Sequence, residues 1–130
     1  NMVLAQESKD SREHLWIQSK QKEIEAHVAW HGKITGMYCE ALLREHPAFS
    51  YLIRTGEEEG HFYLSFVQSP LSFKHQPFVI RFSVKGWFYQ NGYTGITPTV
   101  DELIPLIMHC TPEQCRPIVK QLEFGTAYKL

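Results

Sequence analysis

Cysteine is scarce in this chain, which has only Cys39, Cys110 and Cys115 among its 130 residues. A small, odd number argues against a disulfide framework and suits a reducing compartment. A catalytic site would have to use Cys110 with His109, but the side chains of adjacent residues diverge. A zinc site would have to use Cys110 and Cys115, which with one histidine fall short of a four-ligand set. We therefore expect small buried thiols, with no metal, no cofactor and no catalytic role.

Net charge and long apolar runs are also lacking. The formal net charge is −1 and the pI is about 6.7, so no overall field favours nucleic acid or an anionic membrane. No apolar run approaches the roughly 20 residues that span a bilayer, and the first residues do not have the pattern of a signal peptide. We expect one cytoplasmic domain with no nucleic-acid partner and no membrane insertion. The oligomeric state is not readable.

Two helices are predicted before the first strand. Residues 5–28 are polar, rich in Glu, Lys and Gln, and free of Gly and Pro, which favours a helix. After Gly36 an apolar stripe at helical spacing runs to His46-Pro47 and predicts an amphipathic helix of about ten residues.

A sheet and a last helix follow. Aromatic and β-branched runs predict strands at 48–53, 62–67 and 78–84, with a hairpin through 85–86 to 87–89. Residues 90–98 are interpreted as a loop, Thr99 and Glu102 as a helix cap, and 117–119 as a last short strand. This order predicts an α+β fold, in which a central antiparallel β-sheet is flanked by two α-helices and an extra helix precedes it.

Arg54 is the anomaly in this pattern, because it follows Tyr51-Leu52-Ile53 in a strand predicted to be central. A buried guanidinium is costly unless an anion pairs with it. One interpretation is a structural ion pair with Glu57, Glu58 or Glu59, or an edge position that reaches water. The other is a phosphate site, since arginine can bind two phosphate oxygens at once.

Several spaced motifs run through the chain in a fixed order. They are WHGKIT (30–35), EALL (40–43), FSYLIR (49–54), GHFYLSF (60–66), FVIR (78–81), GWFY (86–89) and VDELI (100–104). Together they resemble the Src homology 2 (SH2) family from roughly Ala29 to Ile118, and several agreeing motifs are more specific than one. The resemblance implies a phosphotyrosine-binding module that docks tyrosine-phosphorylated proteins and is not an enzyme.

The resemblance also implies which residues bind. Arg54 would grip the phosphate, the loop after it would add donors, and the fourth strand would supply two basic residues. The implied phosphotyrosine-binding residues are Arg54, Thr55, Gly56, Glu57, Lys74 and His75. For Lys74 and His75, plain loop surface is an equal alternative. A second, apolar pocket would read residues after the phosphotyrosine through Tyr89, Tyr93 and Ile96, although ordinary core or loop packing is equally expected of these residues.

Departures from the family pattern weaken the predicted pocket. Gly36 stands where a second basic residue is usual, and Gly56 stands where a phosphate-binding serine is common. The acidic loop 57–59 would repel phosphate if it pointed inward, so a solvated turn is the favoured interpretation. Such divergence is typical of SH2 domains that intracellular bacterial pathogens deliver as effectors, which would place the protein in the host cytoplasm.

The expected organisation is a helical extension at 1–28, an SH2-like domain at 29–122 and a tail at 123–130. The alternative function keeps this fold without phosphate binding, as a pseudo-module that uses the N-terminal helix as its interface.

Overall fold

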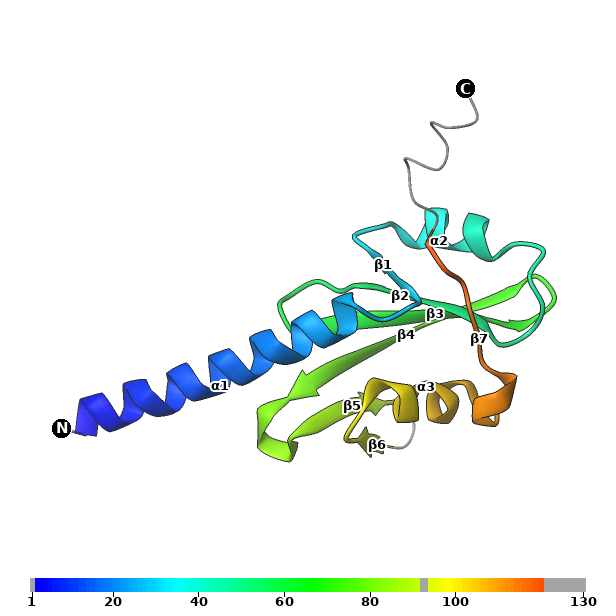
Figure 1. Ribbon diagram of the computed structural model, residues 1–130. Coiled ribbons are helices and arrows are strands. Elements are labelled where there is room, and N and C mark those ends of the chain that lie inside the picture. Colours follow the sequence, from blue (N-terminus) through cyan, green and yellow to red (C-terminus); the bar gives the residue numbers. More distant parts are fainter. Residues whose placement is uncertain (1, 92–93, 121–130) are drawn as a thin grey trace, which may run out of the picture.

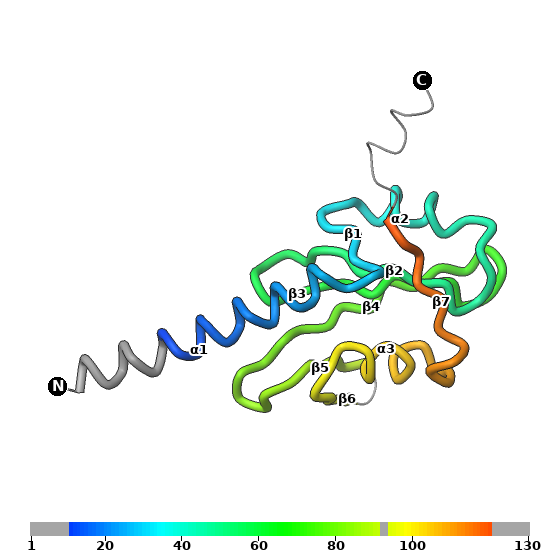
Figure 2. The backbone as a smooth tube through the Cα atoms, in the orientation of Figure 1, coloured from blue at the N-terminus to red at the C-terminus, as the bar shows by residue number. Residues whose placement is uncertain are grey.

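The computed structural model describes residues 2–91 and 94–120, with side chains from residue 11 onward (Figure 2). The predicted tail, 123–130, and Tyr93 lie outside the described residues. The elements, in chain order, are α1 (Met2–Glu25), β1 (Trp30–Gly32), α2 (Gly36–Leu43), β2 (Ser50–Thr55), β3 (His61–Ser69), β4 (Ser72–Arg81), the 3-10 turn η1 (Phe82–Val84), β5 (Gly86–Gln90), β6 (Thr94–Thr97), α3 (Val100–Met108), the 3-10 turn η2 (Pro112–Gln114) and β7 (Arg116–Pro117).

One sheet organises these elements (Figure 1). Its strands lie in the order β1-β2-β3-β4-β5-β6, and β7 also pairs with β2. The pairs from β2 to β6 are antiparallel, whereas the short strands β1 and β7 both run parallel to β2. The predicted α+β fold with a mainly antiparallel central sheet and an N-terminal helix is confirmed.

Each face of the sheet is covered by a helix, with α2 on one side and α3 on the other (Figure 1). The larger core lies on the α3 side and includes Ile53, Phe62 and Leu64. The smaller core lies on the α2 side and consists of Cys39, Leu43, Leu52 and Val67. Because side chains alternate along a strand, Arg54 shares the α2 side with Leu52.

Local signals explain where the two flanking helices begin. The Thr35 hydroxyl accepts the Tyr38 N–H at 3.0 Å and caps α2. Thr99 and Glu102 form the predicted capping box of α3. Pro105 lies inside α3, which nevertheless continues to Met108.

The first helix ends at Glu25, three residues before the predicted end. The chain turns there because the Ala29 N–H donates to Nδ1 of His27 at 3.0 Å, which replaces a helical hydrogen bond. Beyond the turn, Nε2 of His27 lies 2.7 Å from Asp101 at the start of α3. Fully buried Ile24 and the edge contact of Trp16 with Phe82 pack the helix against the domain.

The interpretation of 90–98 as a loop was wrong for five residues, since Gln90 ends β5 and Thr94–Thr97 forms β6, which pairs with β5. Turn-forming residues at Asn91-Gly92 suggested a loop, yet that pair is also a strong hairpin signal. Strand β4 likewise begins at Ser72 and ends at Arg81, and Phe82–Val84 is a 3-10 turn and not part of the strand. The last strand is Arg116–Pro117, where 117–119 was predicted.

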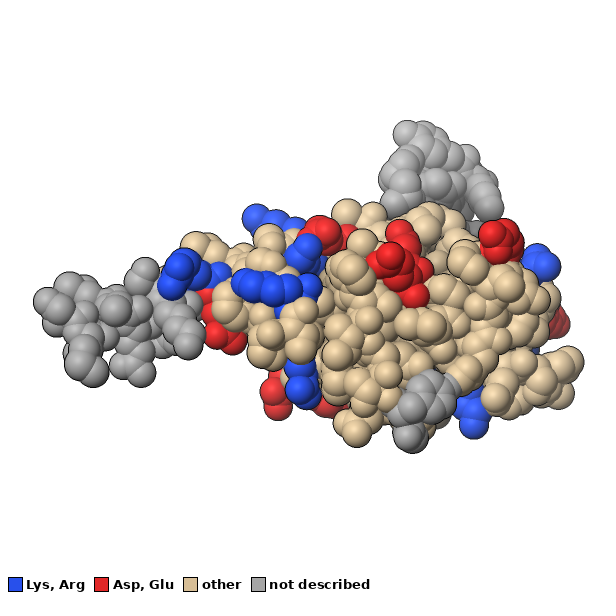
Figure 3. All heavy atoms as spheres, turned by 90° about the horizontal axis from the view of Figure 1, so that it is seen from below, with Lys and Arg blue, Asp and Glu red and all other residues tan. Residues whose placement is uncertain are grey.

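Charged side chains are unevenly distributed on the face seen in Figure 3. Lys, Arg, Asp and Glu side chains gather at the end of the face from which α1 projects, whereas fewer lie over the rest of that face. Within the described ranges, none of the helices is both long and apolar enough to cross a bilayer.

Candidate functional site

Arg54 lies near the end of β2, where the register pairs it with Tyr63 of β3. Its Nε–H donates to Ser65 Oγ at 3.1 Å, and one terminal nitrogen makes a long contact of 3.5 Å with the Ile34 carbonyl. The other terminal nitrogen is 3.2 Å from Nδ1 of His75, and the guanidinium carbon lies 4.4 Å from the centre of the Tyr63 ring. An arginine has five N–H donors, so these contacts hold the group in place and leave two donors for a ligand.

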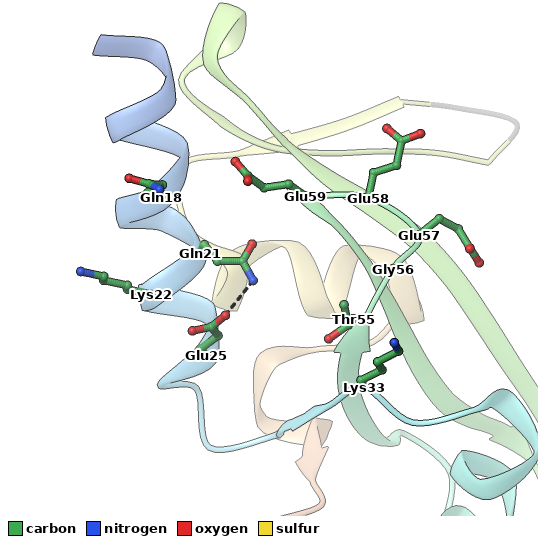
Figure 4. A pocket seen from close by; sticks show the side chains of 10 residues that line it. All are labelled: Gln18, Gln21, Lys22, Glu25, Lys33, Thr55, Gly56, Glu57, Glu58 and Glu59. Atoms are coloured by element: carbon green, nitrogen blue, oxygen red, sulfur yellow. Dashed lines mark hydrogen bonds between the residues drawn. The ribbon is translucent and has the colours of Figure 1, made fainter. Parts of the chain in front are cut away.

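The partners of this guanidinium are neutral groups. Among the side chains that the structure describes, no carboxylate lies within 4.0 Å of Arg54. Among these described side chains, Arg54 therefore does not form the structural ion pair with the acidic loop 57–59. Glu57, Glu58 and Glu59 are exposed and point in different directions, with Glu59 toward α1 (Figure 4). A half-buried cation without a counterion favours binding an external anion.

A polar network positions His75 beside Arg54. Its Nδ1 lies 2.8 Å from the Ser65 hydroxyl, and its Nε2 lies 2.6 Å from a carboxylate oxygen of Glu40. This arrangement suits Nδ1 as acceptor and the Nε2–H as donor to Glu40. Sequence reasoning missed Ser65 and Glu40, although both lie inside motifs of the predicted domain. The signal for Ser65 was its alternation with the core residues of β3.

A cavity of about 660 Å³ opens beside the guanidinium. The predicted residues Thr55, Gly56 and Glu57 line it, together with Lys33, which the sequence did not single out as a binding residue. The Gly56 N–H donates to the His61 carbonyl at 2.8 Å, so this backbone donor is already used.

The two glycines in place of family residues differ in their surroundings. A Cβ at Gly36 would lie 3.5 Å from a terminal nitrogen of Arg54 and 3.8 Å from a ring carbon of His75, which are ordinary contacts. A Cβ at Gly56 would lie only 2.6 Å from the carbonyl of His61. The first position therefore accepts a Cβ beside Arg54, and the second requires glycine.

The structure brings His75 to Arg54 but not Lys74. The register places His75 opposite Ser65 and Lys74 opposite Phe66. Phe66 belongs to the core on the α3 side, so Lys74 projects from that side of the sheet and is exposed. Adjacent residues on a strand face opposite sides of the sheet, so only one of the two can face Arg54. Sequence spacing did not fix the strand register and therefore did not show which one.

The predicted specificity residues are separated. Tyr89 is 4% exposed, packs in the α3-side core, and its hydroxyl donates to the Leu106 carbonyl at 3.4 Å. Ile96 is 49% exposed on β6. The structure thus makes Tyr89 part of the core and leaves Ile96 exposed.

A neighbouring cavity of about 770 Å³ lies between α1 and the loop after β2 (Figure 4). It shares Lys33, Thr55, Gly56 and Glu57 with the Arg54 cavity. On α1, Gln21 donates to Glu25 at 2.8 Å along its wall. The N-terminal helix is thus placed next to the loop that borders Arg54.

The three cysteines are free thiols. Cys39 is fully buried below Arg54, and burial raises its pKa. Cys110 and Cys115 are partly buried, with sulfur atoms 3.8 Å apart. Among the side chains that the structure describes, from residue 11 onward, no three of His, Cys, Asp or Glu gather in a way that could hold a metal ion.

Comparisons with known proteins agree with this fold. The family model described as SH2 domain matches residues 30–109. The fold is similar to the solution structure of the SH2 domain of human proto-oncogene protein VAV1, with a TM-score of 0.50 and 14% sequence identity. That match covers 64% of this chain and 57% of the other, so the chain spans little more than half of its length. None of the curated proteins matches this chain.

Proposed function

Because the chain belongs to the SH2 domain family, we propose that it docks tyrosine-phosphorylated peptides or proteins through Arg54, as an interaction module of signalling and not as an enzyme. The observation that carries this proposal is the Arg54 guanidinium itself. It is held by Ser65, His75 and the Ile34 carbonyl, meets no carboxylate among the described side chains, and borders a cavity.

The chemistry of the cavity suits a phosphate. Phosphotyrosine carries about −1.5 to −2 charges at pH 7 and three acceptor oxygens. Two Arg54 N–H groups can bind two of those oxygens, and charge-assisted hydrogen bonds of this kind contribute roughly 1.5 to 3 kcal/mol each. Thr55, Glu57 and Lys33 line the same cavity, and the Thr55 hydroxyl, the Glu57 N–H and the Lys33 ammonium are further donors. We assign them to the remaining phosphate contacts.

His75 and Glu40 act on the ligand through Arg54. The imidazole fixes one terminal nitrogen of the guanidinium, and Glu40 fixes the imidazole. A guanidinium already oriented loses less side-chain entropy when phosphate binds, which favours affinity. Ile96 is the exposed apolar residue that we propose contacts the peptide beyond the phosphotyrosine.

Fluorescence polarisation with a mixed phosphotyrosine peptide library tests the proposal. Phosphorylated peptides should bind and their unphosphorylated counterparts should not. Arg54→Ala should abolish binding, and Arg54→Lys should weaken it greatly because one ammonium cannot form the bidentate pair. Arg12→Ala is the matched control, since Arg12 is exposed on α1 and is not among the residues that line the cavity.

Two results would contradict the proposal. Phosphopeptide binding that survives Arg54→Ala would show that the phosphotyrosine binds elsewhere on the chain. Complete absence of phosphopeptide binding by a folded protein would favour the phosphate-independent scaffold, with α1 as the interface. The proposed site of action is the cytoplasm, or the host cytoplasm if the chain is a delivered bacterial effector, with 29–122 as the binding domain.

A further inference from the structure

A third hollow lies on the other side of α2, between that helix and β7, and is called the α2–β7 groove. Its volume is about 840 Å³. Figure 1 shows how β7, coloured orange, runs from the α3 end of the molecule toward α2. The groove is formed by segments far apart in the sequence, because β1 and β7 both pair with β2.

The charged side chains that line this groove have one sign. Lys33, Arg116 and Lys120 are cationic at neutral pH, and no aspartate or glutamate lines the groove. Among the described side chains, none of the three permanent cations has a carboxylate within 4.0 Å. This local excess contrasts with the overall net charge of −1. Cations that share a concave surface focus a positive potential there.

The groove continues into the Arg54 cavity. Lys33, Ile34 and Tyr38 line both hollows, so a chain seated at Arg54 has a direct path into the groove. The groove is also partly apolar, since Leu42 and Ile118 line it. A concave, partly apolar wall with cations along it matches an extended acidic peptide better than a flat membrane surface.

We propose that the α2–β7 groove binds an acidic segment next to the phosphotyrosine. The preferred ligand class is then a phosphotyrosine peptide with aspartate or glutamate near the modified residue. This inference rests on the proposed function, because it places the phosphotyrosine at Arg54. The Arg54 cavity supplies phosphate dependence, and Arg116 and Lys120 supply the preference for acidic sequence.

Fluorescence polarisation with three phosphotyrosine peptides of equal length tests the inference. The residues on both sides of the phosphotyrosine are acidic in one peptide, neutral in the second and basic in the third. The wild-type chain should bind the acidic-flanked peptide about tenfold more tightly than the neutral one, the sum expected of a few exposed ion pairs. The double variant Arg116→Gln/Lys120→Gln should lose this preference and keep its affinity for the neutral peptide. Arg12→Gln/Lys22→Gln on α1 removes the same charge and should keep the preference.

Charge reversal gives a second readout. Arg116→Glu/Lys120→Glu should turn the preference toward the basic-flanked peptide, and an unchanged preference would overturn the inference. Equal affinity of the wild type for the acidic and neutral peptides would also overturn it, while Arg54-dependent binding of both would leave the proposed function standing. If no phosphopeptide binds at all, both fail.

Two other ligands of the groove, a membrane surface and a second copy of the chain, would give different results. Vesicles of anionic lipid that bind the wild type but not Arg116→Gln/Lys120→Gln, with no peptide preference, would assign the groove to a membrane surface. A dimer of the wild type that the same variant dissociates, measured by light scattering, would assign it to a second copy of the chain. Either result, without a flank preference, contradicts the inference.

Discussion

Replacing Gly36 with arginine is expected to strengthen phosphotyrosine binding. Gly36 is the first residue of α2, and a Cβ there would lie 3.5 Å from a terminal nitrogen of Arg54 without a clash. An arginine side chain at this position can reach the same cavity and donate to a phosphate held by Arg54. The substitution therefore tests whether the cavity beside Arg54 is the phosphate site.

The expected gain is moderate. A hydrogen bond between charged groups contributes about 1.5 to 3 kcal/mol, and immobilising one long side chain costs about 0.5 to 1.5 kcal/mol. The difference of about 1 to 1.5 kcal/mol corresponds to a Kd lower by about five- to tenfold. Without phosphate the two guanidinium groups repel each other, so Tm should fall in the free protein and recover when phosphopeptide is added.

The assay is a peptide titration with Gly36→Arg, Met37→Arg and Gly36→Ala. Met37 is 84% exposed on the same turn of α2, so arginine there changes the net charge equally but points into solvent. Only Gly36→Arg should give the full gain, and Gly36→Ala should bind as the wild type does. Equal gains at positions 36 and 37 would show general attraction and not a positioned contact. A folded Gly36→Arg variant with unchanged or weaker binding would refute the reasoning.

Two predictions concern stability. Gly56→Ala should lower the free energy of unfolding by about 1 to 3 kcal/mol, because its Cβ would lie 2.6 Å from the His61 carbonyl; chemical denaturation against Gly36→Ala measures this, and equal stabilities would contradict it. Burial raises the pKa of Cys115 from 9.0 to about 12 and also raises that of Tyr51. Since both pKa values are higher in the folded state, stability should be full below about pH 9 and decline as the pH rises toward 12. Urea midpoints from pH 8 to 11 should show this decline, less steeply in Cys115→Ser, and a flat wild-type profile would be evidence against it.

Local chemistry explains why much of the architecture was predictable. Strand β2 was found because aromatic and β-branched residues mark a buried strand, and the α3 capping box because Thr99 and Glu102 stand three residues apart. Both signals lie within a few residues of the element that they specify. Arg54 stood out for the same reason, as a charge inside an apolar run.

Pairing between distant segments explains what was missed. Residues 94–97 became a strand because β5 supplies partners for their backbone groups, which composition does not record. Lys74 was grouped with His75 because they are adjacent, yet strand alternation sends them to opposite sides of the sheet. Lys33 joined the Arg54 cavity only because β1 lies beside the end of β2.

The sequence by itself determined the fold class, the order of the three helices and the strands β2 to β5, the family resemblance and the choice of Arg54 as the residue to examine. Each of these depends on residue type and short spacing. Only the tertiary structure decided that Arg54 meets no carboxylate among the described side chains, that Gly36 has room where Gly56 has none, and that cations from both ends of the domain line one groove. Those facts depend on which strands pair and on the direction of each side chain, and both are set by packing across long separations in the chain.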